Sequence, residues 1–114
     1  MSLKSKSVRL WSGMDDGTIQ EVRLRCTSDD RLGFELFVGR EILLVPIDHA
    51  HLHAALNSRE VTVEMPSCRC SMVPVDESIS FLFQGSGTVR FLMRRNQFAV
   101  LAKNVGLKEP DTAP

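Results

Sequence analysis

Two segments of the chain align with each other without gaps: LLVPIDHAHLHAAL, residues 43–56, and FLMRRNQFAVLAKN, residues 91–104. Each begins as an apolar strand, reaches a residue that favours a helix N-cap, and continues with apolar residues at helical spacing. The predicted caps are Asp48 and Asn96. The alignment therefore indicates an internal repeat of a strand followed by a short helix.

Apolar and polar residues alternate with a period of two in most other segments, a pattern typical of strands with one buried face. Val22, Leu24 and Cys26, for example, alternate with charged residues. The segment Ile42–Ile47 is almost continuously apolar, which predicts a strand covered on both faces. The predicted strands span residues 8–12, 19–26, 32–38 and 41–47 before a helix at 48–57, and residues 60–65, 68–75, 79–84 and 88–94 before a helix at 96–105.

This order of elements is four strands and one helix, twice. We therefore predict an α+β domain, a mostly antiparallel sheet or open barrel of about eight strands with two short helices packed against it. The 114 residues, of which 43% are hydrophobic and 25% charged, are sufficient to bury one core. We expect a single domain at residues 1–114, with an ordered core at 8–106 and two pseudo-repeats at 8–57 and 58–106.

The doubled order resembles the Whirly-type and transcriptional-coactivator-type single-stranded-DNA-binding fold, in which two such units pack about a pseudo-twofold axis. The resemblance covers roughly residues 8–106 and concerns the order of the predicted elements. It implies a non-enzymatic binding module for single-stranded nucleic acid. The sequence has no Whirly-like Lys/Gly motif, so the resemblance assigns no role to any particular residue.

Charge and composition limit the partners and the location. Fourteen Lys and Arg residues balance fourteen Asp and Glu residues, so binding to nucleic acid would require a local basic patch. No apolar run approaches the roughly 20 residues that span a bilayer, and the start of the chain lacks the apolar core of a signal peptide. Cys26, Cys68 and Cys70 are odd in number and lie on the apolar sides of their strands, which favours buried, reduced thiols. We expect a cytoplasmic protein without a membrane partner.

Arginines supply the candidate residues for binding nucleic acid, because a guanidinium group suits both phosphate contacts and base stacking. Alternation places them on the polar faces of three predicted strands. Two interpretations remain open: the arginines form one basic surface, or they pair across strands with Glu21, Glu35, Glu60 and Glu64. The candidates are Arg23, Arg25, Arg69, Arg90, Arg94 and Arg95.

Protein interaction or assembly, including a homo-oligomer, is the alternative function, with Trp11 and Phe37 as the exposed aromatic contacts. A third class is small-ligand or metal binding by the histidine-rich helix, where His49 and His53 share a face. Spacing marks no third ligand, so we expect structural histidines, no metal site and no cofactor. The sequence also lacks a nucleophile elbow, a dinucleotide fingerprint and a Cys–His catalytic set, and we predict that it is not an enzyme.

Overall fold

The computed structural model describes residues 5–15, 17–85 and 87–108, and it contains two four-stranded antiparallel sheets. Sheet A consists of β1 (Ser5–Asp15), β2 (Thr18–Thr27), β3 (Leu32–Val38) and β4 (Glu41–Ile47), and the helix α1 (His49–Leu56) follows it. Sheet B consists of β5 (Val61–Glu64), β6 (Arg69–Val75), β7 (Ser78–Gln84) and β8 (Thr88–Arg94), and α2 (Arg95–Asn104) follows it. Within each sheet the strands lie side by side in sequence order. The predicted α+β class with eight strands and two helices is confirmed.

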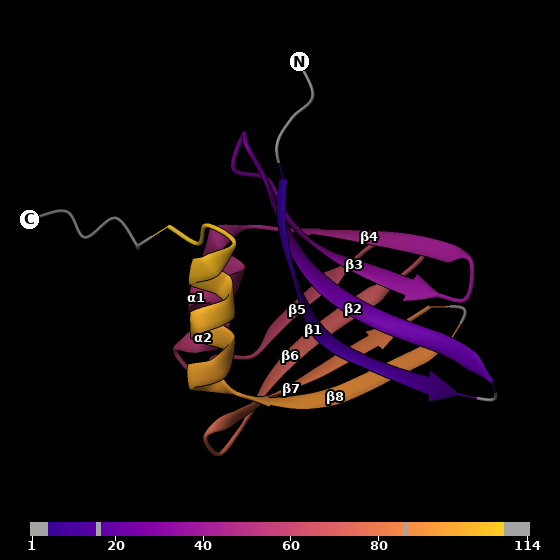
Figure 1. The fold of residues 1–114 in the computed structure, drawn as a ribbon. Coiled ribbons are helices and arrows are strands. Elements are labelled where there is room, and N and C mark those ends of the chain that lie inside the picture. Colours follow the sequence, from indigo (N-terminus) through magenta and orange to yellow (C-terminus); the bar gives the residue numbers. More distant parts are fainter. Residues whose placement is uncertain (1–4, 16, 86, 109–114) are drawn as a thin grey trace, which may run out of the picture.

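The two sheets pack face to face over one hydrophobic core, and α1 and α2 lie together at one end of them (Figure 1). Phe34 of sheet A meets Phe81 and Phe83 of sheet B edge to face, with ring centroids 6.2 and 5.3 Å apart. From α2, Phe98 brings its ring centroid to 5.0 Å from that of Phe81. Both sheets and α2 therefore share one aromatic centre.

The period-two pattern of the sequence explains which face of each strand enters this core. On β2, Val22 and Leu24 are fully buried and Cys26 is 6% exposed, while the intervening residues face outward. On the other sheet, Cys70 and Met72 are fully buried in the same way. Each sheet therefore has an inner apolar face and an outer face that no other element covers within residues 5–15, 17–85 and 87–108.

The two helices begin differently. Asp48 is the N-cap of α1, as predicted, and its backbone N–H donates to Nδ1 of His51 over 3.0 Å. The prediction of Asn96 as the second cap is wrong, because α2 begins at Arg95 with Arg94 as its N-cap. Arg94 is also the last residue of β8, so the strand passes directly into the helix. The Arg95 N–H donates to the Glu77 carbonyl at 2.9 Å.

Both helices end in the same way, with a pair of backbone hydrogen bonds that satisfies the last carbonyls. After α2, the N–H groups of Gly106 and Leu107 donate to Lys103 and Ala102, and Gly106 has a φ of 107°. After α1, Ser58 and Arg59 donate to Ala55 and Ala54 in the same arrangement, and Ser58 has a φ of 61°. Gly106 thus ends the second helix with a positive φ, and Ser58 occupies the corresponding place after the first.

Candidate binding surfaces

The arginines that the sequence singles out do not lie on one surface. Arg23 and Arg25 alternate with the buried residues of β2, so they lie on the outer face of sheet A. Arg69 on β6, and Arg90 and Arg94 on β8, alternate with the buried residues of sheet B. Because the inner faces of the sheets pack together, these two sets of arginines point away from each other.

On sheet A the arginines are paired with glutamates. Oε1 of Glu21 lies 2.8 Å from Nε of Arg9, and its other carboxylate oxygen lies 3.4 Å from the guanidinium group of Arg23. Glu35 lies 3.5 Å from the guanidinium group of Arg25. The glutamate-pairing interpretation therefore describes this face, and its arginines are not free for phosphate groups.

The outer face of sheet B is different, because Arg90 and Arg94 are exposed and form no ion pair with any carboxylate in the described part of the chain. Leu92 lies between them on β8 and is 64% exposed. On β7, the residues opposite the two arginines are Leu82 and Ser78, which carry no charge. These β8 residues thus form a short cationic and apolar stripe.

Arg69 extends this face toward β5. Its Nε lies 3.5 Å from a carboxylate oxygen of Glu64, and the two side chains are 55% and 71% exposed. An ion pair this exposed contributes little to stability and exchanges readily with solvent or with another anion. We call Arg69, Arg90 and Arg94 with Leu92 the arginine face.

Arg95 does not belong to the arginine face, because its side chain connects two other segments of the fold. Its side chain is half-buried, and one guanidinium nitrogen donates to Oγ of Ser58 at 2.5 Å and to the carbonyl of Asp76 at 3.4 Å. It thereby joins the end of α1 to the turn between β6 and β7. These contacts occupy the guanidinium group away from the arginine face.

The two candidate aromatic residues are also separated. The β1–β2 register shifts between Arg9 and Trp11, and Trp11 then pairs with the buried Val22. Its ring stacks on Phe91 of sheet B, with centroids 5.7 Å apart and planes 2° apart. Trp11 is therefore half-buried against the core, contrary to the expected exposed contact. Phe37 does face outward, on sheet A, although it too is only partly exposed.

Sequence reasoning missed an apolar strip on the outer face of sheet A. Phe37 lies opposite Ile42 of β4, and Leu44 and Pro46 follow Ile42 on the same face of that strand. Ile42 and Leu44 are 59% and 53% exposed, so the expected covering of both faces of this strand is not present in the described chain. At the other end of the strip, Ile19 lies on the neighbouring strand β2, diagonal to Phe37. The apolar strip consists of Met14, Ile19, Phe37, Ile42, Leu44 and Pro46.

A shallow hollow adjoins this strip, because Gly33 has no side chain at an outward position of β3. The hollow has a volume of about 270 Å³. Leu44 and Pro46 line one side, and the paired side chains of Arg25 and Glu35 line the other. An apolar side chain of a docked partner would fit beside Leu44 and Pro46.

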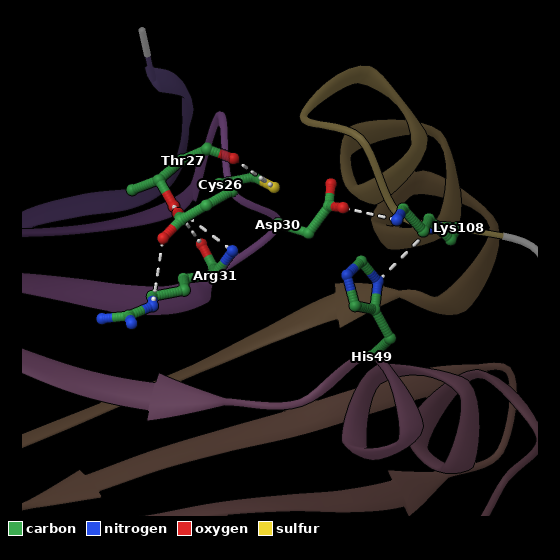
Figure 2. Close-up of polar contacts among 7 residues, drawn as sticks. Cys26, Thr27, Asp30, Arg31, His49 and Lys108 are labelled. Atoms are coloured by element: carbon green, nitrogen blue, oxygen red, sulfur yellow. Dashed lines mark hydrogen bonds and ion pairs between the residues drawn. The ribbon is translucent and has the colours of Figure 1, made fainter. Parts of the chain in front are cut away.

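Two histidines of α1 hold the segment that follows α2, and Figure 2 shows the contact that His49 makes with Lys108. Nδ1 of His49 accepts the Lys108 backbone N–H at 3.3 Å, and Nε2 of His53 lies 2.5 Å from the Lys108 carbonyl oxygen, to which it donates. The Lys108 ammonium group pairs with Asp30 in the loop between β2 and β3. Across the described ranges, no three His, Cys, Asp or Glu side chains come together as metal ligands.

The three cysteines are free and buried, as predicted. Burial raises the pKa of Cys26, with a further contribution from Asp30 and Asp29 (Figure 2). Burial also raises the pKa of Cys68, and it raises that of Cys70 to about 12. All three thiols are therefore protonated near neutral pH, and none has the lowered pKa of an activated nucleophile.

Comparisons with protein-family models, with curated proteins and with solved structures find no match to this chain. No helix in the described residues is long and apolar enough to cross a membrane. The arginine face and the apolar strip are therefore the features from which a function is to be inferred.

Proposed function

We propose that this protein is a non-enzymatic binding module that contacts single-stranded nucleic acid through the arginine face of sheet B. The observation that carries the proposal is the exposure of Arg90 and Arg94 without carboxylate partners in the described chain. Glu64 is the one acidic residue at the outward positions of β5–β8. A flat face with three arginines and one glutamate attracts phosphate groups even though the whole chain has no net charge.

Binding at this face would rely on charge and on guanidinium stacking. The outward positions of β5–β8 hold no aromatic residue, so the aromatic base platforms of many single-strand binders are absent from these strands. Arginine can form bidentate contacts with phosphate and stack on bases, and Leu92 offers an apolar contact between two arginines. We therefore expect modest affinity with little sequence preference.

The doubled order of four antiparallel strands and a helix supports a Whirly-type arrangement as part of the same proposal. Superposition of residues 8–57 on residues 58–106 in an experimental structure tests it. A pseudo-twofold axis relating the two units is expected. Units that do not superpose would contradict the Whirly-type arrangement. They would not contradict the proposed role of the arginine face, which depends on sheet B alone.

Salt dependence tests the proposed function, with fluorescence anisotropy of a labelled oligothymidylate of about 20 nucleotides as the readout. Three phosphate contacts give a slope of about −2 in log K against log salt, so a fourfold rise in salt should weaken binding by about 20-fold. The double variant Arg90→Ala/Arg94→Ala should lose most of the binding. Each replaced side chain is exposed, so the fold should be retained.

The matched control is Arg9→Ala/Arg40→Ala, which removes the same charge from exposed positions outside the arginine face. This variant should bind almost as well as the unmodified protein. Equal losses in the two double variants would show that net charge alone attracts the oligonucleotide. Absence of binding to the unmodified protein at low salt would contradict the proposal.

A further inference from the structure

Lys108 is tied to two other segments of the fold by three contacts, and Figure 2 shows those made by His49 and Asp30. Nδ1 of His49 accepts the Lys108 backbone N–H at 3.3 Å, and Nε2 of His53 donates to the Lys108 carbonyl at 2.5 Å. The Lys108 ammonium group pairs with Asp30 in the β2–β3 loop. Lys108 therefore joins the segment after α2 to α1 and to this loop. We call these three contacts the Lys108 clasp.

The two histidines of the clasp respond differently to a proton. Because Nδ1 of His49 accepts an N–H, it must carry no proton itself, and the proton of the neutral ring is on Nε2. Nε2 of His53 is the donor to a carbonyl oxygen, a role that the neutral and the protonated ring can both fill. Protonation therefore removes the His49 contact and leaves the His53 contact possible.

The surroundings of His49 oppose a charged ring while the clasp is closed. Nε2 of His49 is buried and forms no hydrogen bond within the described chain, so no solvent or protein acceptor stabilises a charge there. His49 is also the first residue of α1, where the helix dipole disfavours a cation. A protonated ring becomes more favourable once the segment after α2 moves away and solvent reaches the ring.

The charged groups around α1 also give no net stabilisation to a protonated His49. The helix packs against α2, β5 and β6. Arg95 of α2 binds Ser58 at the other end of α1, and Glu64 of β5 pairs with Arg69 of β6. The charged groups toward the His49 end come from the helix cap, the β2–β3 loop, β1, the last turn of α2 and the segment after it. They are Asp29, Asp30, Asp48, Lys6, Arg31, Lys103 and Lys108. Basic side chains outnumber acidic ones in this set, so the hydrogen-bond arrangement of His49 decides.

We propose that His49 makes the Lys108 clasp depend on pH: unprotonated His49 holds Lys108 against α1, and binding of a solvent proton at Nδ1 releases it. Asp30 then loses the anchored position of its ammonium partner, so the β2–β3 loop is no longer tied to the end of α2. Gly106 and Leu107 stay in place, because their N–H groups donate to carbonyls of α2 itself. The clasp lies outside the arginine face, so this inference goes beyond the proposed function.

The size of the effect follows from the proton that the released state binds. A solvent-exposed histidine has an ordinary pKa of about 6.5. If the closed clasp excludes one proton that the released state accepts, lower pH favours release. The ratio of released to closed clasp should therefore rise about tenfold between about pH 7.5 and about pH 5.5.

NMR of the ¹⁵N-labelled full chain tests the proposal through the heteronuclear NOE, which reports fast backbone motion. The NOE of the Lys108 amide should fall as the pH is lowered, with the same midpoint as the ring signals of His49. The Leu107 amide, which donates to Ala102, should keep its NOE. A Lys108 NOE that is unchanged at about pH 5.5 would overturn the proposal. A simultaneous loss of order at Leu107 and throughout α2 would also overturn it, because it would indicate general unfolding.

Three variants separate His49 from the other histidines of α1. His49→Asn places an amide oxygen, which accepts an N–H but does not titrate, near the position of Nδ1, so its Lys108 NOE should be the same at both pH values. His53→Gln retains a donor near Nε2 and should keep the pH dependence of the unmodified protein. His51→Asn should also keep it, because His51 accepts the Asp48 N–H and does not contact Lys108.

An unchanged pH dependence in His49→Asn would overturn the proposal, as would its loss in His51→Asn with His49 still present. Oligonucleotide binding by the arginine face is not expected to change in His49→Asn, because α1 contributes nothing to that face. Failure of the clasp is therefore distinguishable from failure of the proposed function.

Discussion

Cys70 should make the stability of this protein fall at alkaline pH. Its thiol is fully buried on β6, and burial, with a smaller contribution from Cys68, raises its pKa from 9.0 to about 12. Above about pH 9 the unfolded chain therefore releases this proton while the folded chain retains it. Since the unfolded state then binds fewer protons, the free energy of unfolding decreases as pH rises, by about 3 kcal/mol between about pH 8 and about pH 11.

Urea denaturation under reducing conditions, followed by the fluorescence of Trp11, measures this effect. Trp11 is the one tryptophan, and its ring stacks on Phe91. The chain has no tyrosine, so no phenol ionises in this range. The control is Cys70→Ala, which should retain the contributions of Cys26 and Cys68 but lose the share that belongs to Cys70. An identical pH dependence in the variant and the unmodified protein would refute the argument.

Two further predictions concern the helix ends and the thiols. Gly106→Ala should lower the free energy of unfolding, measured by urea denaturation, by about 1–2 kcal/mol, because a φ of 107° is unfavourable for a residue with a Cβ. An unchanged free energy of unfolding would contradict the conformation assigned to Gly106. In native protein, Cys26, Cys68 and Cys70 should react with an aromatic disulfide reagent far more slowly than in denaturant, because all three are buried. Three fast native reactions would contradict their placement.

The alternation of apolar and polar residues predicted most of the fold, because the side-chain period of a strand is set locally by the backbone. The bounds of β3, β4 and β8 match the predicted ranges, and both helices lie within about two residues of theirs. Two details differ: β1 runs from Ser5 to Asp15 where residues 8–12 were predicted, and the N-cap of α2 is Arg94 instead of Asn96. Arg95 donates its N–H to Glu77 on another turn, and the sequence near Asn96 contains no signal of that contact.

The candidate site was less predictable, because alternation tells which residues share a face of one strand but not which sheet that strand joins. Arg23 and Arg90 have the same outward character in the sequence, yet they lie on opposite sides of the molecule. Trp11 was misplaced because the register shift after Arg9 turns it toward Phe91. The exposure of Leu44 could not be predicted because an apolar run does not show whether its own chain or another covers it.

The most direct test of the proposed function is an NMR titration of ¹⁵N-labelled protein with an unlabelled oligothymidylate. The account predicts that backbone amide shifts concentrate on β8, residues 88–94, and on β6 around Arg69, while β2 around Arg23 and Arg25 changes little. Shifts centred on β2, or no shifts at low salt, would contradict the assignment of the arginine face as the binding surface.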